Sequence, residues 1–135
     1  MAFTAESRGV KQVEDFQASK PIYMQIVDKI SHQIVRGEIK PGEKLPSVRE
    51  MAIKSGVNPN TIQRTYSELE RMAIVETRRG QGTFVTEVNA VVLELKNRLQ
   101  NDMIEIFVKN MRELGFSKEE MISGLKNYVD REGRE

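Results

Sequence analysis

The fold is set by residues 47–85, which read SVREMAIKSGVNPNTIQRTYSELERMAIVETRRGQGTFV. Ser47 and Glu50, three residues apart, form a capping-box pattern that predicts the start of a short helix. Asn58 followed by Pro59 predicts the start of another helix, because asparagine caps free amides and proline needs no amide at the first helical position. The stretch therefore begins with two short helices joined by a turn.

The neighbouring patterns add a helix before these two and a hairpin after them. Residues 21–37 place isoleucines four apart, at Ile22, Ile26, Ile30 and Ile34, which predicts an amphipathic helix. After the next two helices, β-branched runs flank the basic, glycine-rich residues 78–82 and predict a two-stranded hairpin. The order helix, helix, helix, hairpin is that of a winged helix-turn-helix. The predicted fold class is mainly α with a small β-hairpin.

A long helix and a second capping box follow the hairpin. The apolar residues after residue 87 recur at three- and four-residue steps up to Gly115, and Ser117 with Glu120 predicts a last helix. We interpret this two-helix tail as a dimerisation element, with packing against the chain's own first domain as the alternative. The expected domains are an arm (1–20), a winged helix-turn-helix (21–86) and the tail (87–135). The expected dimerisation residues are Val92, Leu95, Leu99, Met103, Ile106, Phe107, Met111, Leu114, Leu125 and Tyr128.

The composition limits the class of protein. The chain has 135 residues, 39% hydrophobic and 30% charged, which suits one compact domain with an appendage. It contains no cysteine, no long apolar run and no secretory signal, so we expect a cytoplasmic protein without disulfides. The net charge of +1 conceals a basic middle: residues 20–86 carry eleven Lys or Arg against seven Asp or Glu, a net of +4. That excess gives modest support to a polyanionic partner.

The helix-turn-helix pattern predicts where DNA would be contacted. The second helix of such a pair enters the major groove, where Asn and Gln pair with adenine edges and Arg pairs with guanine or phosphate. Arginines beside glycines at a hairpin tip suit a minor groove. The expected DNA-binding residues are Lys44, Ser47, Arg49, Asn58, Asn60, Thr61, Gln63, Arg64, Arg78, Arg79, Gly80, Gln81 and Gly82.

The sequence contains few residues that could form a catalytic site. His32 is the only histidine and has no cysteine or second histidine to complete a metal site or a triad. A phosphate-binding glycine loop with its lysine is absent as well. We therefore expect neither an enzyme, nor a metal, nor a cofactor.

Residues 22–86 resemble the DNA-binding domain of the GntR family of bacterial regulators. The resemblance rests on the G-x-x-x-P-G-x-x-L-P-S-x-R-x-x-A stretch from Gly37, on N-x-x-T in the third helix, and on R-x-G-x-G-T-F-V in the wing. It implies that Ser47, Arg49, Thr61 and Arg64 lie near DNA. Other members often carry arginine at the positions of Pro59 and Gln63, so their operator sequences do not transfer to this chain. The short tail is similar to that of the YtrA-like subfamily, small dimeric repressors often associated with ABC transporter operons.

Together these patterns predict a homodimeric repressor that binds an inverted-repeat, double-stranded DNA operator. The alternative is a winged-helix module that binds protein instead of DNA. The sequence does not specify the operator, the target genes, a small-molecule effector, the choice between repression and activation, or a role for residues 1–20.

Overall fold

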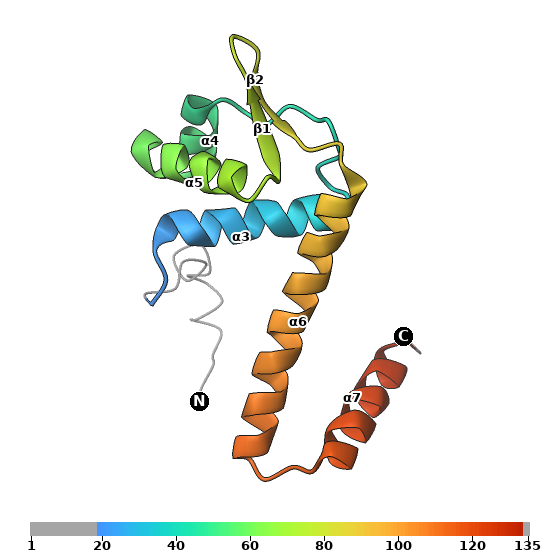
Figure 1. Cartoon of the computed structure of the whole chain (residues 1–135). Helices are drawn as coiled ribbons and strands as arrows, with labels where there is room; N and C mark the ends of the chain where they lie inside the picture. Colours follow the sequence, from blue (N-terminus) through green and yellow to red (C-terminus); the bar gives the residue numbers. More distant parts are fainter. Residues whose placement is uncertain (1–18, 134–135) are drawn as a thin grey trace. The chain divides into compact units, whose positions relative to one another are not determined.

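The computed structural model describes residues 19–133, which carry five helices and one two-stranded sheet. The predicted fold class is confirmed: the chain is mainly helical with a small antiparallel hairpin (Figure 1). Almost all of the expected N-terminal arm lies outside the described residues. The elements are α3 (Ile22–Val35), α4 (Val48–Ser55), α5 (Pro59–Arg71), β1 (Val75–Arg78), β2 (Gly82–Val85), α6 (Asn89–Glu113) and α7 (Lys118–Glu132).

Capping residues determine where α4 and α5 begin. Ser47 Oγ accepts a hydrogen bond from the Glu50 amide, and the Glu50 carboxylate accepts one from the Ser47 amide. Asn58 Oδ1 accepts a hydrogen bond from the Asn60 amide at 2.7 Å, immediately before α5. Gly56 ends α4 in the left-handed region, at a φ of +70°, which glycine adopts without strain. The predicted caps are therefore present, and they define the turn between the two helices.

The wing consists of β1, the tip (residues 79–81) and β2. The strands are antiparallel, with Val75 opposite Val85 and Arg78 opposite Gly82. The predicted hairpin is therefore confirmed, and it projects beyond α4 and α5 in Figure 1.

The hydrophobic core lies where α3 and α4 pack on α5 and where α5 meets the base of the wing. Ile62, Leu69 and Val85 are completely buried, with 0% of their surface exposed. Ile22 was expected on the buried face of α3 but is 45% exposed, because it is the first residue of the helix, where fewer neighbours cover a side chain. The buried residues of α3 are Ile26, Val27, Ile30, Ser31 and Ile34.

The chain divides into two compact units within α6, one ending at Leu95 and the other beginning at Lys96. In the second unit, Ser117 and Glu120 form the predicted capping box at the start of α7. Met121 is the one buried residue among the described residues of this unit. The second unit therefore has almost no core of its own, and the domain boundary expected after residue 86 stays a prediction.

Candidate nucleic-acid interface

The exposed face of α5 carries the polar side chains that were expected to read DNA. Asn60, Gln63 and Arg64 are exposed in the first two turns of the helix, and Thr61 is half-buried beside them. Ile62, on the opposite face, is fully buried. The core thus holds the helix while amide and guanidinium groups remain available for base edges or phosphates.

The start of α4 offers one cation and one carboxylate. Arg49 is exposed in the first turn. Two hydrogen bonds from Ser47, first that of its backbone amide and then that of its side chain, hold the pKa of the Glu50 carboxyl below its usual value. Ser47 Oγ accepts a hydrogen bond from the Glu50 amide and is thereby the cap of α4. Asn58 serves as the cap of α5 in the same way.

A buried tyrosine ties α5 to the segment that precedes α4. The Tyr66 hydroxyl donates a hydrogen bond to the Pro46 carbonyl at 2.7 Å, and the side chain is buried. Burial raises the pKa of Tyr66 to about 12, with a smaller contribution from the charge of Glu50. The phenol is therefore a neutral donor at ordinary pH, and it keeps the beginning of α4 in place against α5.

Lys44 lies against the base of the wing tip. The Leu45 amide donates a hydrogen bond to the Thr83 carbonyl at 2.8 Å, and Lys44 forms a β-bridge with Phe84, so this segment runs along β2. A Cβ atom added at Gly82 would lie 2.7 Å from Lys44 Cε, and Gly82 has a φ of +126°. Glycine at this position therefore leaves room for the stem of the Lys44 side chain to lie against β2.

The two adjacent wing arginines have different surroundings. The Arg78 guanidinium lies 4.1 Å from the centroid of the Phe84 ring and forms ion pairs with Glu76 (2.9 Å) and Glu87 (3.6 Å). Arg79 is exposed and forms no ion pair within residues 19–133. The charge of Arg78 is thus largely compensated within the chain, whereas that of Arg79 is available to a partner.

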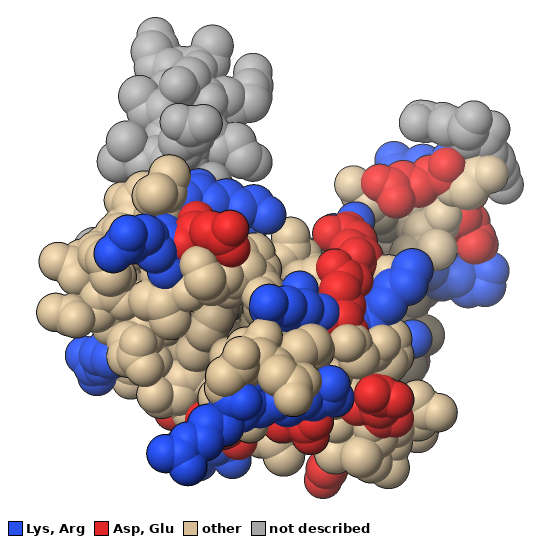
Figure 2. Space-filling view, turned by 90° about the horizontal axis from the view of Figure 1, so that it is seen from above, with Lys and Arg blue, Asp and Glu red and all other residues tan. Residues whose placement is uncertain are grey.

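Charges of both signs are visible when the chain is viewed from the side to which the wing projects in Figure 1. Figure 2 gives this view and shows patches of Lys and Arg between large uncharged areas, with acidic side chains among them. Such a mixture suits a surface that combines phosphate contacts with polar base contacts.

Sequence reasoning missed the aromatic rings next to the arginines. The Arg64 guanidinium lies 4.0 Å from the centroid of the Tyr23 ring, and no sequence signal links these two residues. The pairing of Arg78 with Glu76 had a signal, because residues two apart in a strand share one face.

The expected dimerisation residues differ in exposure. Leu95 is only 3% exposed in the single chain, so it has little surface left for a partner, whereas Leu114 is 73% exposed. Val92, Leu99, Phe107 and Met111 are half-buried, and Met103, Ile106, Leu125 and Tyr128 are exposed. The expected dimerisation residues do not include four further exposed apolar side chains of the second unit: Ile104, Phe116, Ile122 and Val129.

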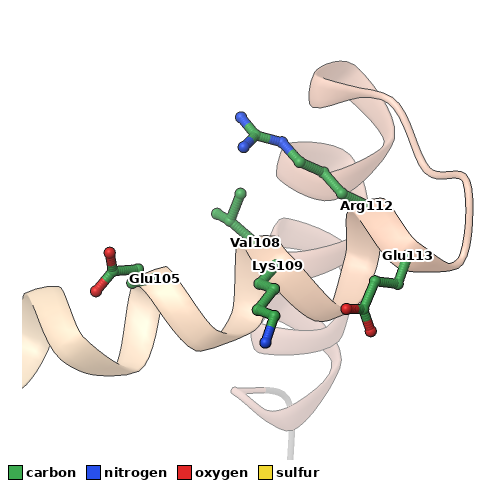
Figure 3. A pocket seen from close by; sticks show the side chains of 5 residues that line it. All are labelled: Glu105, Val108, Lys109, Arg112 and Glu113. Carbon is green, nitrogen blue, oxygen red and sulfur yellow. The ribbon is translucent and has the colours of Figure 1, made fainter.

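Two depressions lie on the surface of the described residues. In the first unit, one of about 820 Å³ lies beside α4 and includes Glu43, Leu45, Glu50 and Lys54 in its lining. In the second unit, one of about 590 Å³ is lined by side chains of α6 alone, four of which are charged (Figure 3). A ligand site is a concave cavity that encloses most of its ligand, whereas a depression lined by one helix alone is typical of a solvated helix face.

Metal-binding and membrane-spanning features are absent from the described part of the chain. Residues 19–133 contain no group of three His, Cys, Asp or Glu side chains placed to hold a metal ion. No helix among them has the length and apolar character needed to cross a bilayer.

Comparison with known proteins gives matches over most of the chain. The family described as "Bacterial regulatory proteins, gntR family" matches residues 22–85. The uncharacterized HTH-type transcriptional regulator YhcF of Bacillus subtilis is 62% identical over 115 residues, which are 85% of this chain and 95% of that protein. The HTH-type transcriptional repressor YtrA of the same species is 36% identical over 83% of this chain and 87% of that protein. A GntR family transcriptional regulator from Listeria monocytogenes has a similar structure, with a TM-score of 0.78, 46% identity and coverage of 83% and 98%.

Proposed function

Because the chain belongs to the GntR family of bacterial regulatory proteins and is a DNA-binding transcriptional regulator, we propose that it represses transcription as a homodimer on an inverted-repeat operator. Like its relatives, which are transcriptional regulators, it is a regulator and not an enzyme. The observation that carries the proposal is the face of α5, where exposed Asn60, Gln63 and Arg64 stand on a helix whose other side is buried in the core. A helix of this kind can enter a major groove without any change of fold.

Each expected contact has a chemical role in this proposal. Asn60 and Gln63 carry side-chain amides, which pair with adenine edges, and so would contribute to sequence preference. Arg49, Arg79 and Lys44 carry exposed charges and would contribute affinity that falls with salt. The wing tip, with Arg79 between Arg78 and Gly80, would approach the minor groove.

The second compact unit supports the homodimer. Nine large hydrophobic side chains in its described part are exposed, and Met121 alone is buried. Exposed apolar area of this extent favours association, because burial stabilises by about 25 cal/mol per Å² of apolar surface. A twofold dimer buries the same face on both copies and presents two α5 helices, which suits two half-sites about one helical turn apart.

Repression is the finer part of the proposal. It is supported by the name of YtrA, a transcriptional repressor 36% identical to this chain. The resemblance of the tail to YtrA-like regulators suggests an ABC transporter operon as the target. In this proposal the dimer represses by covering the operator and blocking polymerase.

The experiment is a selection of duplexes from a random DNA pool by the purified full chain, with sequencing of the bound fraction at two salt concentrations. Sedimentation equilibrium measures the mass of the free protein and of the complex. We expect a palindromic motif, an affinity that falls with salt, and the mass of a dimer. No enrichment at low salt would instead favour a winged-helix module that binds protein, and a monomer on DNA would refute the dimer.

A further inference from the structure

We propose that Tyr23 is a positioning residue that holds the Arg64 guanidinium ready to contact operator DNA. The inference rests on the proposed function, since it assumes that α5 enters a DNA groove. It assigns to α3 a direct influence on recognition, in addition to its place in the core.

The geometry brings a ring from the first turn of α3 against a cation of α5. The Arg64 Cζ atom lies 4.0 Å from the centroid of the Tyr23 ring, well within the range of about 6 Å at which a cation is attracted to an aromatic ring. Tyr23 is half-buried, whereas Arg64 is exposed. The ring is thus part of the folded scaffold, and the cation on it faces solvent.

The position of the ring is determined by the packing of α3 on α5. Thr65, next to Arg64, is fully buried, and its Oγ1 lies 3.3 Å from the Tyr23 carbonyl and 2.9 Å from the Thr61 carbonyl. The Thr65 hydroxyl therefore links the backbone carbonyl of Tyr23, in α3, to α5, the helix that carries Arg64. The separation between ring and guanidinium therefore does not depend on a flexible loop.

Within residues 19–133 no carboxylate compensates the charge of Arg64, which has neither an ion pair nor a hydrogen bond there. By contrast, Arg71, about two turns further along α5, is paired with Glu68, and Arg78 is paired with Glu76. Attraction to a ring leaves the N–H donors of a guanidinium available, whereas a carboxylate would occupy them. Arg64 is therefore both restrained and able to donate to a base edge or a phosphate.

Restraint of this kind favours binding. An arginine that is free to rotate loses side-chain entropy when it binds, and one already held near its bound position loses less. The ring should therefore raise the affinity for DNA through Arg64 and should have no effect on affinity when Arg64 is absent. That conditional effect separates a positioning role from a purely structural one.

The test is a double-mutant cycle with Y23L, R64A and the double variant, measured as binding of the full chain to a duplex obtained from the random-pool selection. Loss of an exposed cation–π contact predicts about a two- to fivefold weakening per subunit, hence about four- to twenty-fivefold for a dimer. R64A should weaken binding at least as much, and Y23L should have no further effect in the R64A background. Y23F, which keeps the ring, should bind within about twofold of wild type.

The outcomes separate this inference from the proposed function. Wild-type protein that selects no duplex would overturn both. Wild-type protein that binds, with Y23L and R64A weakening binding independently, would overturn the positioning role alone. R64A with unchanged affinity would do the same, because Arg64 would then serve only to fasten α5 to α3. Thermal unfolding of every variant confirms that the measured proteins are folded.

Discussion

Replacing Arg79 with alanine should weaken DNA binding and also make that binding less sensitive to salt. Arg79 is exposed at the wing tip and unpaired within residues 19–133, so its charge is available to a phosphate. Each phosphate neutralised on B-DNA contributes about −0.9 to the slope of log affinity against log salt concentration. Two copies in a dimer would therefore contribute about −1.8, which between about 50 and 200 mM salt corresponds to about a twelvefold difference in affinity.

Fluorescence anisotropy of a labelled operator duplex, measured at several salt concentrations, gives this slope for each variant. The matched control is R36A, which removes the same charge at the end of α3, where Arg36 is paired with Glu38 at 2.8 Å. We expect the wild-type slope for R36A and a slope less steep by about 1.8 for R79A. An R79A protein with the wild-type slope and affinity would refute the assignment of Arg79 to a phosphate contact.

Three further predictions concern the tail, a buried hydrogen bond and a helix cap. Leu125→Asp places a charge in the exposed apolar face of the second unit and should give a monomer by sedimentation equilibrium; an unchanged dimer would contradict the proposed interface. Tyr66→Phe removes the hydrogen bond to the Pro46 carbonyl and should lower the free energy of unfolding in urea by about 1 kcal/mol. Because the folded-state pKa of Tyr66, about 12, is above its ordinary value of 10.0, the wild type should also lose stability as pH rises from 10 toward 12, a loss that Y66F should not show. Ser47→Ala removes a cap and should lower the free energy of unfolding by about 1 kcal/mol. The lowered pKa of Glu50 stabilises the fold above the ordinary carboxyl pKa of 4.5, and this contribution disappears as pH falls through the folded-state value, so the S47A variant should show a smaller acid-side loss than wild type.

The secondary structure could be predicted closely because its signals are local. The capping box at Ser47 and the Asn58 cap each act within four residues, and each is present where the sequence indicated. The four-residue spacing of isoleucines predicted the buried face of α3 from Ile26 onward. It failed at Ile22, because periodicity alone does not indicate how much of a helix end its neighbours cover.

The candidate site could be predicted only as a set of residues. Arg78 and Arg79 are adjacent and identical in type, and in the sequence only the two-residue spacing between Glu76 and Arg78 separates them. The register of the hairpin places Arg78 over Phe84 and beside Glu76, and Arg79, at the tip, has no ion pair within the described part of the chain. Cross-strand neighbours depend on register, which local patterns do not specify for so short a hairpin.

For the tail, the sequence correctly indicated two amphipathic helices, since apolar residues at three- and four-residue steps need only a helical backbone to form a stripe. Whether a given apolar residue is already covered was decided by tertiary structure: Leu95 is buried in the single chain, whereas Leu114 on the same helix is exposed.

The sequence by itself thus determined the helices, their caps, the hairpin and the family, because these depend on residues close together in the chain or on a motif that is read residue by residue. Tertiary structure alone decided which cations are compensated and which are held by a ring. The Tyr23 ring contacts the Arg64 guanidinium because α3 packs on α5. The Lys44 side chain lies against Gly82 because the segment before α4 runs along β2. Contacts of this kind join residues far apart in the chain, and their strength depends on distances of a few ångströms that only the packed fold sets.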